Sequence, residues 1–231
     1  MRISIVVPAH NEQENIAETI NKIEDCQGIE HELIVVNDHS SDATPRIVSD
    51  LIARYPNLRL VHNTAEAGFA NAVRAGLAQI KTGAVVTVMA DLCDDLNILK
   101  DMLEKIQSGY DVVGGCRYIK GGARLGGSRL KGFLSSLGGR TINFLVGIPT
   151  HDIANAFKMY RKEVIDSIDI KSMGFEISME IPLKAYYAGF KITEVPTVWR
   201  ERTRGKSNFK ILKLLPSYLK LYVWAIYKRL T

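Results

Sequence analysis

Short runs of valine, isoleucine and leucine recur along the first half of the chain, and stretches with helical spacing separate them. The runs cover residues 3–7, 33–36, 58–61, 84–89 and 110–113. Strands that are apolar at successive positions, rather than at every second one, are typical of a parallel sheet with helices on both faces. Right-handed crossovers between such strands predict a Rossmann-like arrangement for residues 1–115.

The second half of the chain has a different pattern. Residues 117–128 are rich in glycine and arginine, which predicts a mobile loop. Strands are expected at residues 156–160 and 191–198. Apolar residues at helical spacing predict helices at residues 16–23, 47–52, 69–80, 96–106, 129–145, 177–187 and 209–230. The prediction is a single α/β domain, whose mixed sheet is flanked by helices, with an amphipathic helix at its C-terminus.

Two of the apolar runs continue into polar sequences that carry a carboxylate. The first run leads into Pro8, Ala9 and Glu12, and the second leads into Asp38. Ligands bind at the carboxyl ends of strands in an open α/β sheet, and a carboxylate there can accept hydrogen bonds from a ribose or a base. Alternatively, Asn11 and Glu12 cap the following helix. The motif G-x-G-x-x-G is absent, so the pattern favours a nucleotide site over a dinucleotide site.

A third polar cluster follows the run at residues 84–89. Asp91, Asp94 and Asp95 place three carboxylates within five residues. Hard divalent cations such as Mg²⁺ and Mn²⁺ prefer oxygen ligands, and such a cation can neutralise a diphosphate. Acidic residues also favour the start of a helix. We therefore expect Asp91 to be a metal ligand, Asp94 to be a second candidate, and Asp95 to start the helix.

Charge is distributed unevenly along the chain, whose formal net charge is +5. Residues 1–100 contain 8 basic and 14 acidic residues, whereas residues 101–231 contain 22 basic and 11 acidic residues. The second half is expected either to face an anion, such as nucleic acid, lipid phosphate or a membrane surface, or to form a solvated basic face. No nucleic-acid-binding module is recognisable, so we expect no nucleic acid partner. The candidate phosphate-binding side chains form two clusters, Arg117, Arg124, Arg129 and Lys131 in the first, and Arg202, Arg204 and Lys206 in the second.

The last stretch, residues 209–231, combines apolar residues with lysines and arginines. No run of 18 apolar residues exists, so this segment is not expected to span a bilayer. It fits a helix at a membrane interface, with Trp224 and Tyr227 near the headgroups, or a helix packed on the domain or on a second subunit of a homo-oligomer. The three cysteines lack paired spacing and the chain begins with a strand, so we expect a cytoplasmic, membrane-peripheral protein.

Five motifs occur in a characteristic order and spacing. They are V-V-P-A-H-N-E at 6–12, N-D-H-S-S-D at 37–42, A-D-L at 90–92, G-C-R-Y at 115–118 and G-F-E-I-S-M-E at 174–180. Together they resemble the family-two glycosyltransferases, in the branch of dolichyl-phosphate mannose synthases and related polyprenyl-phosphate glycosyltransferases. The resemblance covers about residues 3 to 210.

This resemblance implies a GT-A fold and an inverting glycosyltransferase. The enzyme would move a sugar from a nucleotide-diphosphate donor, GDP-mannose or a UDP-hexose, to a polyprenyl or dolichyl phosphate at the cytoplasmic membrane face. The domain at residues 1–208 would comprise a nucleotide-binding half, 1–115, and an acceptor half, 116–208, followed by the helix at 209–231. The implied site residues are Pro8, Ala9, Glu12 and Asp38 for the nucleoside, Asp91 for Mg²⁺ or Mn²⁺, Arg117, Lys131 and Ser135 for the acceptor phosphate, Arg202 for a phosphate, and Asp152 and Glu180 as further acidic positions. Of these, Asp91, Arg117 and Arg202 form the implied catalytic set.

The sequence departs from the family pattern at three positions. Met89 replaces the first Asp of the usual D-x-D, Cys93 stands where a Gln is common, and Asn208 stands where a Lys is common. The metal end of the site is therefore the part that differs from the family, and Asp94 is the candidate replacement ligand.

Two other functions remain open at this point. A phosphate acceptor is anionic near neutral pH, so transfer to it needs only positioning and stabilisation of the leaving diphosphate. Transfer to a sugar or protein hydroxyl would need a carboxylate base, for which Asp152, Glu176 and Glu180 are the candidates. A non-catalytic nucleotide-sugar-binding homologue is the other alternative, which Met89 motivates. The Q-x-x-R-W signature of processive polysaccharide synthases is missing.

Overall fold

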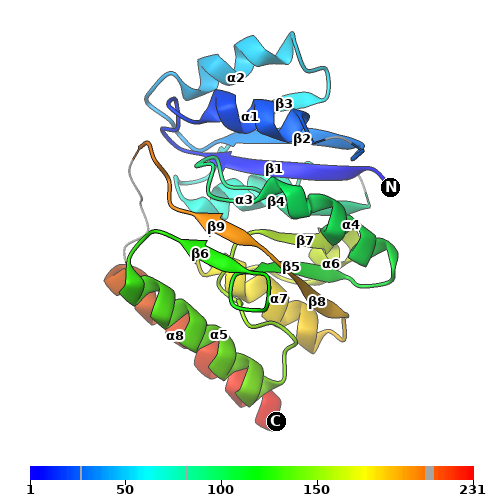
Figure 1. Ribbon diagram of the computed structural model, residues 1–231, viewed down its shortest axis with the longest axis vertical. Coiled ribbons are helices and arrows are strands. Elements are labelled where there is room, and N and C mark those ends of the chain that lie inside the picture. The colour runs from blue at the N-terminus through cyan, green and yellow to red at the C-terminus, as the bar shows by residue number, and fades with distance from the viewer. Residues whose placement is uncertain (27, 82, 206–210) are drawn as a thin grey trace.

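The structure is a computed structural model that describes residues 1–26, 28–81, 83–205 and 211–231. Its strands are β1 (Ile3–Ala9), β2 (His31–Asn37), β3 (Leu58–His62), β4 (Ala84–Thr87), β5 (Val112–Cys116), β6 (Ala123–Leu125), β7 (Lys158–Arg161), β8 (Ile192–Pro196) and β9 (Val198–Arg200). Its helices are α1 (Ile16–Glu24), α2 (Thr44–Ile52), α3 (Phe69–Leu77), the 3₁₀ turn η1 (Leu96–Ile98), α4 (Leu99–Gln107), α5 (Arg129–Val146), α6 (Lys162–Ser167), α7 (Ile177–Tyr187) and α8 (Ile211–Leu230). Figure 1 shows their arrangement.

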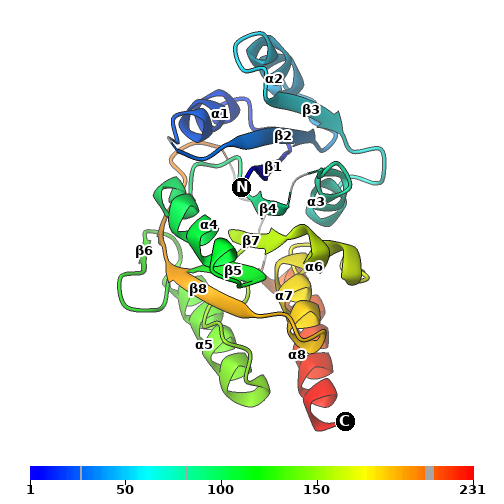
Figure 2. The ribbon, with the colours of Figure 1, turned by 90° about the vertical axis from the view of Figure 1, so that its right-hand side faces the viewer.

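Across the described residues, seven strands form one sheet in the order β3-β2-β1-β4-β7-β5-β8 (Figure 2). β7 runs antiparallel to its neighbours β4 and β5, and the other neighbouring pairs are parallel. The register of β1 with β2 places Ala9 beside Asn37, so the turns that follow these strands start at the same edge of the sheet. The mixed α/β fold expected from the sequence is confirmed.

Helices cover both faces of the sheet. Successive residues of a strand point to opposite faces, so neighbouring residues of β1 enter different clusters. Ile5 and Val7 of β1 belong to a buried cluster with side chains of α1, α2 and α4. Val6 belongs to a second buried cluster, to which α3, α6 and α7 contribute. Every residue of β1 and β4 is buried, which explains the unbroken apolar runs in the sequence.

α5 and α8 contact each other at the end of the molecule opposite α2 (Figure 1). One face of α8 packs on the domain: Ala225 is fully buried, and Trp224 meets the ring of Tyr187 edge-on, with ring centroids 5.6 Å apart. Trp224 is therefore partly buried on the domain, in line with the packed-helix alternative, whereas Tyr227 is 64% exposed; contact of either side chain with headgroups stays a prediction. Within the described residues, no helix has the length and apolarity needed to cross a membrane.

The structure differs from the sequence-based expectation in several segments, one of which is α6, a helix that was not expected. The strand expected at 84–89 ends at Thr87. The segment 117–128, expected to be a loop, contains β6, which pairs with β9. The strand expected at 191–198 is divided at Thr197. The backbone N–H of Thr197 donates to the carbonyl of Cys116 in β5, whereas its own carbonyl accepts from the N–H of Ala123 in β6. β8 therefore joins the main sheet and β9 joins the ribbon with β6.

Candidate active site

Hydrogen bonds join the turns that follow β1 and β2. The Asn11 side-chain oxygen accepts a hydrogen bond from the backbone of Ser41 (2.8 Å), and the Ser40 hydroxyl accepts one from the backbone of Asn11 (3.1 Å). Asn11, His39 and Leu92, which follow β1, β2 and β4, have φ angles of 54°, 54° and 61°. Such left-handed conformations are uncommon outside glycine and gather at functional sites. The carboxyl edge of the sheet is therefore where a site is expected.

Asp38 and the end of β1 form the centre of this edge. Asp38 is buried, and its carboxylate accepts hydrogen bonds from the Asn63 amide (2.7 Å) and the Gly68 backbone N–H (2.9 Å). Pro8 and Ala9 lie in the β1–β2 ladder, so the structure brings them to the same edge as Asp38. Asp38 also shapes the turn between β3 and α3. No sequence motif marks Asn63 or Gly68, so this second role was not expected.

Glu12 forms an ion pair with Arg202, which lies 190 positions later in the chain. The Arg202 Nη2 donates to the two carboxylate oxygens of Glu12 at 2.6 and 2.7 Å, and both side chains are mostly buried. Burial alone would lower the pKa of Arg202, but Glu12 and, more weakly, Asp91 raise it. The sequence predicted a phosphate contact for Arg202. In this structure the Arg202 guanidinium pairs with Glu12, so the late segment covers the turn that follows β1.

The acidic turn after β4 directs its carboxylates toward its own backbone. Asp91 accepts a hydrogen bond from the backbone of Cys93 (3.1 Å), and Asp94 accepts one from the backbone of Met89 (3.0 Å). Asp95 caps η1, as the sequence predicted. Burial, followed by the charge of Asp91, raises the pKa of Asp94 to about 7.

These groups limit how a divalent cation could be held. Within the described part of the chain, no three His, Cys, Asp or Glu side chains gather into a metal site. The thioether of Met89 is a soft group that a hard cation does not favour. Asp91 fits a different arrangement, in which one carboxylate and the substrate's phosphate oxygens hold Mg²⁺ or Mn²⁺ together.

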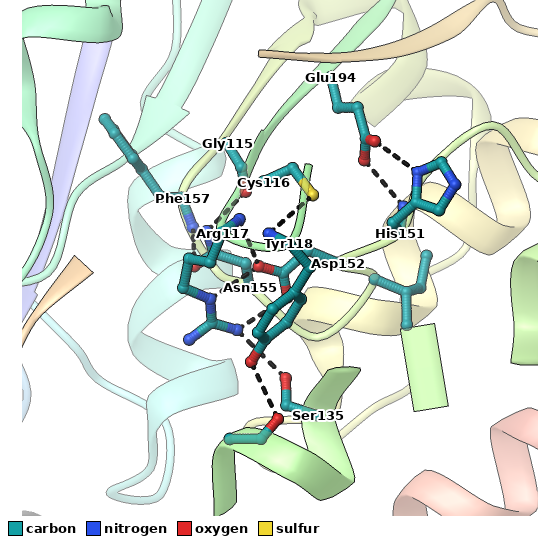
Figure 3. A network of polar contacts seen from close by, with 12 residues as sticks. Gly115, Cys116, Arg117, Tyr118, Ser135, His151, Asp152, Asn155, Phe157 and Glu194 are labelled. Carbon is teal, nitrogen blue, oxygen red and sulfur yellow. Dashed lines mark hydrogen bonds and ion pairs between the residues drawn. The ribbon is translucent and has the colours of Figure 1, made fainter. Parts of the chain in front are cut away.

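A buried polar network surrounds Arg117 at the end of β5 (Figure 3). Arg117 Nε and Nη2 donate to the two carboxylate oxygens of Asp152, each at 2.7 Å, and Nη2 also donates to the Ser135 hydroxyl at 3.2 Å. The side chains of Arg117 and Asp152 are 12% and 1% exposed. Burial opposes the charge of Arg117, but the hydrogen bonds and the charge of Asp152 raise its pKa, so it stays a cation.

The other predicted phosphate-binding residues are distributed around this network. Lys131 precedes Ser135 by four residues on α5 and so lies on the same side of that helix. Arg124 instead packs over the ring of Trp199 at 4.8 Å and donates to the backbone carbonyl of Ser128. Lys206 and Asn208 lie outside the described residues.

The two acidic candidates of the G-F-E-I-S-M-E motif are both engaged. Glu180 accepts hydrogen bonds from the backbone of residues 171–172 (2.9 and 2.7 Å) and from Lys184 (2.5 Å). Burial raises the pKa of Glu180, but these donors outweigh that effect and lower it. Glu176 accepts a hydrogen bond from the backbone of Gly174 (3.1 Å). Both carboxylates therefore fix the segment before α7.

α5 approaches the Asp152 segment at backbone distance. A Cβ atom on Gly139 would lie 2.0 Å from the carbonyl oxygen of His151. Gly139 and Ser135 are four residues apart and share a face of α5, so this close approach sets the position of Ser135 beside Arg117. By contrast, a Cβ on Gly138 would meet no atom of the described residues within 4 Å.

Comparison with known sequences places the chain in a family. Residues 4–169 match Glycosyl transferase family 2, so the chain belongs to that family. Over 97% of its length it is 31% identical to a dolichol-phosphate mannosyltransferase of Pyrococcus furiosus, and it spans 64% of that protein. Over 99% of its length it is 28% identical to a polyprenol monophosphomannose synthase of Mycolicibacterium smegmatis, and it spans 89% of that protein. The chain thus covers less than two thirds of the Pyrococcus relative.

Solved structures share the fold. Glucosyl-3-phosphoglycerate synthase from Mycobacterium tuberculosis, in complex with phosphoglyceric acid, has a TM-score of 0.71 and 18% identity, over 99% of this chain and 79% of that one. The same protein in complex with Mn²⁺, UDP-glucose and phosphoglyceric acid has a TM-score of 0.70 and 18% identity, with the same coverage. At this identity the likeness establishes the fold alone, and it confirms the expected GT-A class.

Gly139→Ala is expected to push α5 away from the Asp152 segment. Overpacking at this point should lower the free energy of unfolding by about 1–3 kcal/mol. Gly138→Ala is the matched control, since its methyl group has room and alanine favours a helix by up to about 1 kcal/mol. Urea unfolding of both variants measures the difference, and equal effects would contradict the close approach.

Proposed function

We propose that the protein is an inverting glycosyltransferase that moves a sugar from a nucleotide-diphosphate donor to a polyprenyl or dolichyl phosphate. The donor in this proposal is GDP-mannose or a UDP-hexose. The names of the two sequence relatives support the lipid-phosphate acceptor. The structural neighbour that binds UDP-glucose supports the class of donor.

The proposal rests on one observation: both carboxylate oxygens of Asp152 accept hydrogen bonds from the guanidinium of Arg117. A hydroxyl acceptor needs a carboxylate that is free to take a proton. Both oxygens of Asp152 accept hydrogen bonds from the guanidinium, and the carboxylates of Glu176 and Glu180 accept hydrogen bonds from backbone N–H groups. A phosphate acceptor needs no base, but it does need a fixed cation, which Asp152 provides by orienting Arg117. The arrangement therefore favours a phosphate over a hydroxyl.

The proposed reaction is a single displacement at the anomeric carbon of the donor sugar. A phosphate oxygen of the acceptor forms the new bond, the bond to the donor diphosphate breaks, and the nucleoside diphosphate leaves with the electron pair. Arg117 and Ser135 position the acceptor phosphate, and Arg202 can turn from Glu12 toward the diphosphate near Asp91. When bound at Asp91, a divalent cation supplies further positive charge to the diphosphate.

The proposal predicts lipid-linked product from a defined assay. The protein is incubated with radiolabelled GDP-mannose, UDP-glucose or UDP-N-acetylglucosamine, Mg²⁺ and polyprenyl phosphate, and label is counted in the organic phase. The double variant Arg117→Met/Asp152→Asn should lose about 10²-fold or more of this activity, because it removes the anchoring cation without leaving a buried charge unpaired. Arg46→Met, on the exposed face of α2, is the control and should keep it.

Two outcomes would overturn this assignment. The first is an absence of organic-phase label with every donor. The second is undiminished transfer to a sugar or protein hydroxyl in the Arg117/Asp152 double variant, which would move the function to the hydroxyl-transferring alternative.

The acidic turn predicts an incomplete metal site that one substitution can restore. Met89→Asp should tighten the Mn²⁺-dependent binding of GDP or UDP by about tenfold, because a second hard ligand joins Asp91. Titration calorimetry with Mn²⁺ and with EDTA measures this directly. Asp94→Asn is the companion variant. If Asp94 had replaced the missing ligand, Asp94→Asn would strongly weaken the Mn²⁺-dependent binding of the nucleotide, and Met89→Asp would change that binding little.

The proposal includes membrane contact through α8, as expected for residues 209–231, and extends it to α5. Neither helix contains an acidic residue, and both carry exposed lysines or arginines that would complement anionic lipid headgroups. The exposed apolar residues are Leu130, Phe133, Leu134, Leu137, Phe144 and Leu145 on α5, and Leu215, Leu219, Val223, Tyr227 and Leu230 on α8. We place this contact at the cytoplasmic face, since the free thiols fit a reducing compartment.

Membrane contact predicts sedimentation with vesicles that contain phosphatidylglycerol. The double variant Phe144→Ser/Val223→Ser should reduce the bound fraction by about tenfold, since two apolar side chains would no longer be buried in lipid. Ile52→Ser is the control, because Ile52 is also exposed but lies on α2 at the opposite end of the molecule. Equal binding by both variants would contradict the contact, as would a stable dimer in light scattering that the Phe144→Ser/Val223→Ser variant dissociates.

A further inference from the structure

Lys158, the first residue of β7, has a buried ammonium group that the proposed reaction does not use. Its side chain is 1% exposed in the middle of the sheet. The ammonium donates hydrogen bonds to the backbone carbonyls of Ile153 (3.0 Å), Asn155 and Ser178 (3.3 Å). A lysine ammonium has three donors, so three converging carbonyls match its hydrogen-bonding capacity.

Two of these carbonyls belong to the segment that immediately follows Asp152. In the same segment, the Asn155 side chain donates to the backbone carbonyl of Gly115 at 2.7 Å, two residues before Arg117. Ser178, which holds the third carbonyl, lies in the first turn of α7. Lys158 therefore ties the Asp152 segment to α7, beside β5, the strand that immediately precedes Arg117.

Lys158 also changes the charge of the phosphate-binding network. The charges of the paired Arg117 and Asp152 offset each other, and a protonated Lys158 adds one positive charge beside them in a poorly solvated interior that Glu194 also faces. Burial lowers the pKa of Lys158 to about 7, Asp152, Cys116 and Glu194 oppose this effect, and Arg117 adds to it. The positive charge is therefore present below pH 7 and is lost as the pH rises through 7.

We infer that Lys158 is a positioning residue for the acceptor phosphate: it holds the Asp152 segment against Arg117 and adds a positive charge to the site. The inference rests on the proposed function for its ligand. By reciprocity, a bound phosphate dianion stabilises the protonated form of Lys158, so acceptor binding above pH 7 takes up a proton.

Kinetics and calorimetry with Lys158→Met test this inference, because methionine fills the same volume without a charge. The variant should raise the KM for polyprenyl phosphate by about tenfold or more, while kcat and the KM for the donor stay within about threefold. At pH 8, the wild type should take up a proton when it binds the acceptor, and Lys158→Met should abolish this uptake. Calorimetry in buffers of different ionisation enthalpy measures the number of protons taken up. Lys162→Met, a partly exposed lysine on the adjacent α6, is the control and should behave as wild type.

Stability measurements separate this inference from the proposed function. A double-mutant cycle with Lys158→Met and Asp152→Asn in urea should give a coupling of at least about threefold in the unfolding equilibrium constant. The inference would be overturned if the two substitutions showed no coupling. It would also be overturned if Lys158→Met raised the KM for the donor as much as the KM for polyprenyl phosphate. Lys158→Gln, which keeps a donor, replaces the methionine variant if that variant does not fold. If the wild type labels no lipid, the proposed function fails, and the cycle still decides whether Lys158 positions Asp152.

Discussion

The buried pair of Arg117 and Asp152 is the interaction on which the second half of the structure depends. Removing two charges from water is costly, and only good geometry with several hydrogen bonds offsets that cost. The geometry requires the end of β5, the segment after α5 and the Ser135 face of α5 to meet at one point. The glycine that lets α5 touch the backbone of His151 is a direct consequence of that requirement.

The two ends of the site obtain their charge in different ways. At the proposed acceptor end, the guanidinium of Arg117 is fixed by the Asp152 carboxylate and stays charged across the physiological pH range. At the proposed donor end, the acidic turn offers Asp91 as an oxygen ligand, and Arg202 brings a guanidinium from a distant part of the chain, where it pairs with Glu12. In the proposed reaction, Arg202 would share the neutralisation of the diphosphate with a divalent cation, for which the thioether of Met89 is a poor ligand.

The strands, most helices and the polar sheet edge could be predicted from the sequence, because apolar runs and strand-end motifs are local signals. The pairing of β6 with β9 could not, since three-residue strands have no periodicity to detect. The partner of Arg202 was also not predictable, because it depends on how a late segment folds back on α1. Lys158 is similar: a lysine in a short strand indicates a surface position, and only the three carbonyls around it show why it is buried.

The ion pair between Glu12 and Arg202 has a consequence for the order in which the molecule is built. Its partners are separated by 190 residues, so the contact closes one of the longest loops in the chain. Contacts of such separation form late, since the entropy of closing the loop must be overcome before they stabilise anything. During synthesis the N-terminal half emerges first and can form β1 to β4 before Arg202, which covers Glu12, has been added to the chain. The edge of the sheet around Glu12 is thus completed only after the late segment has been made.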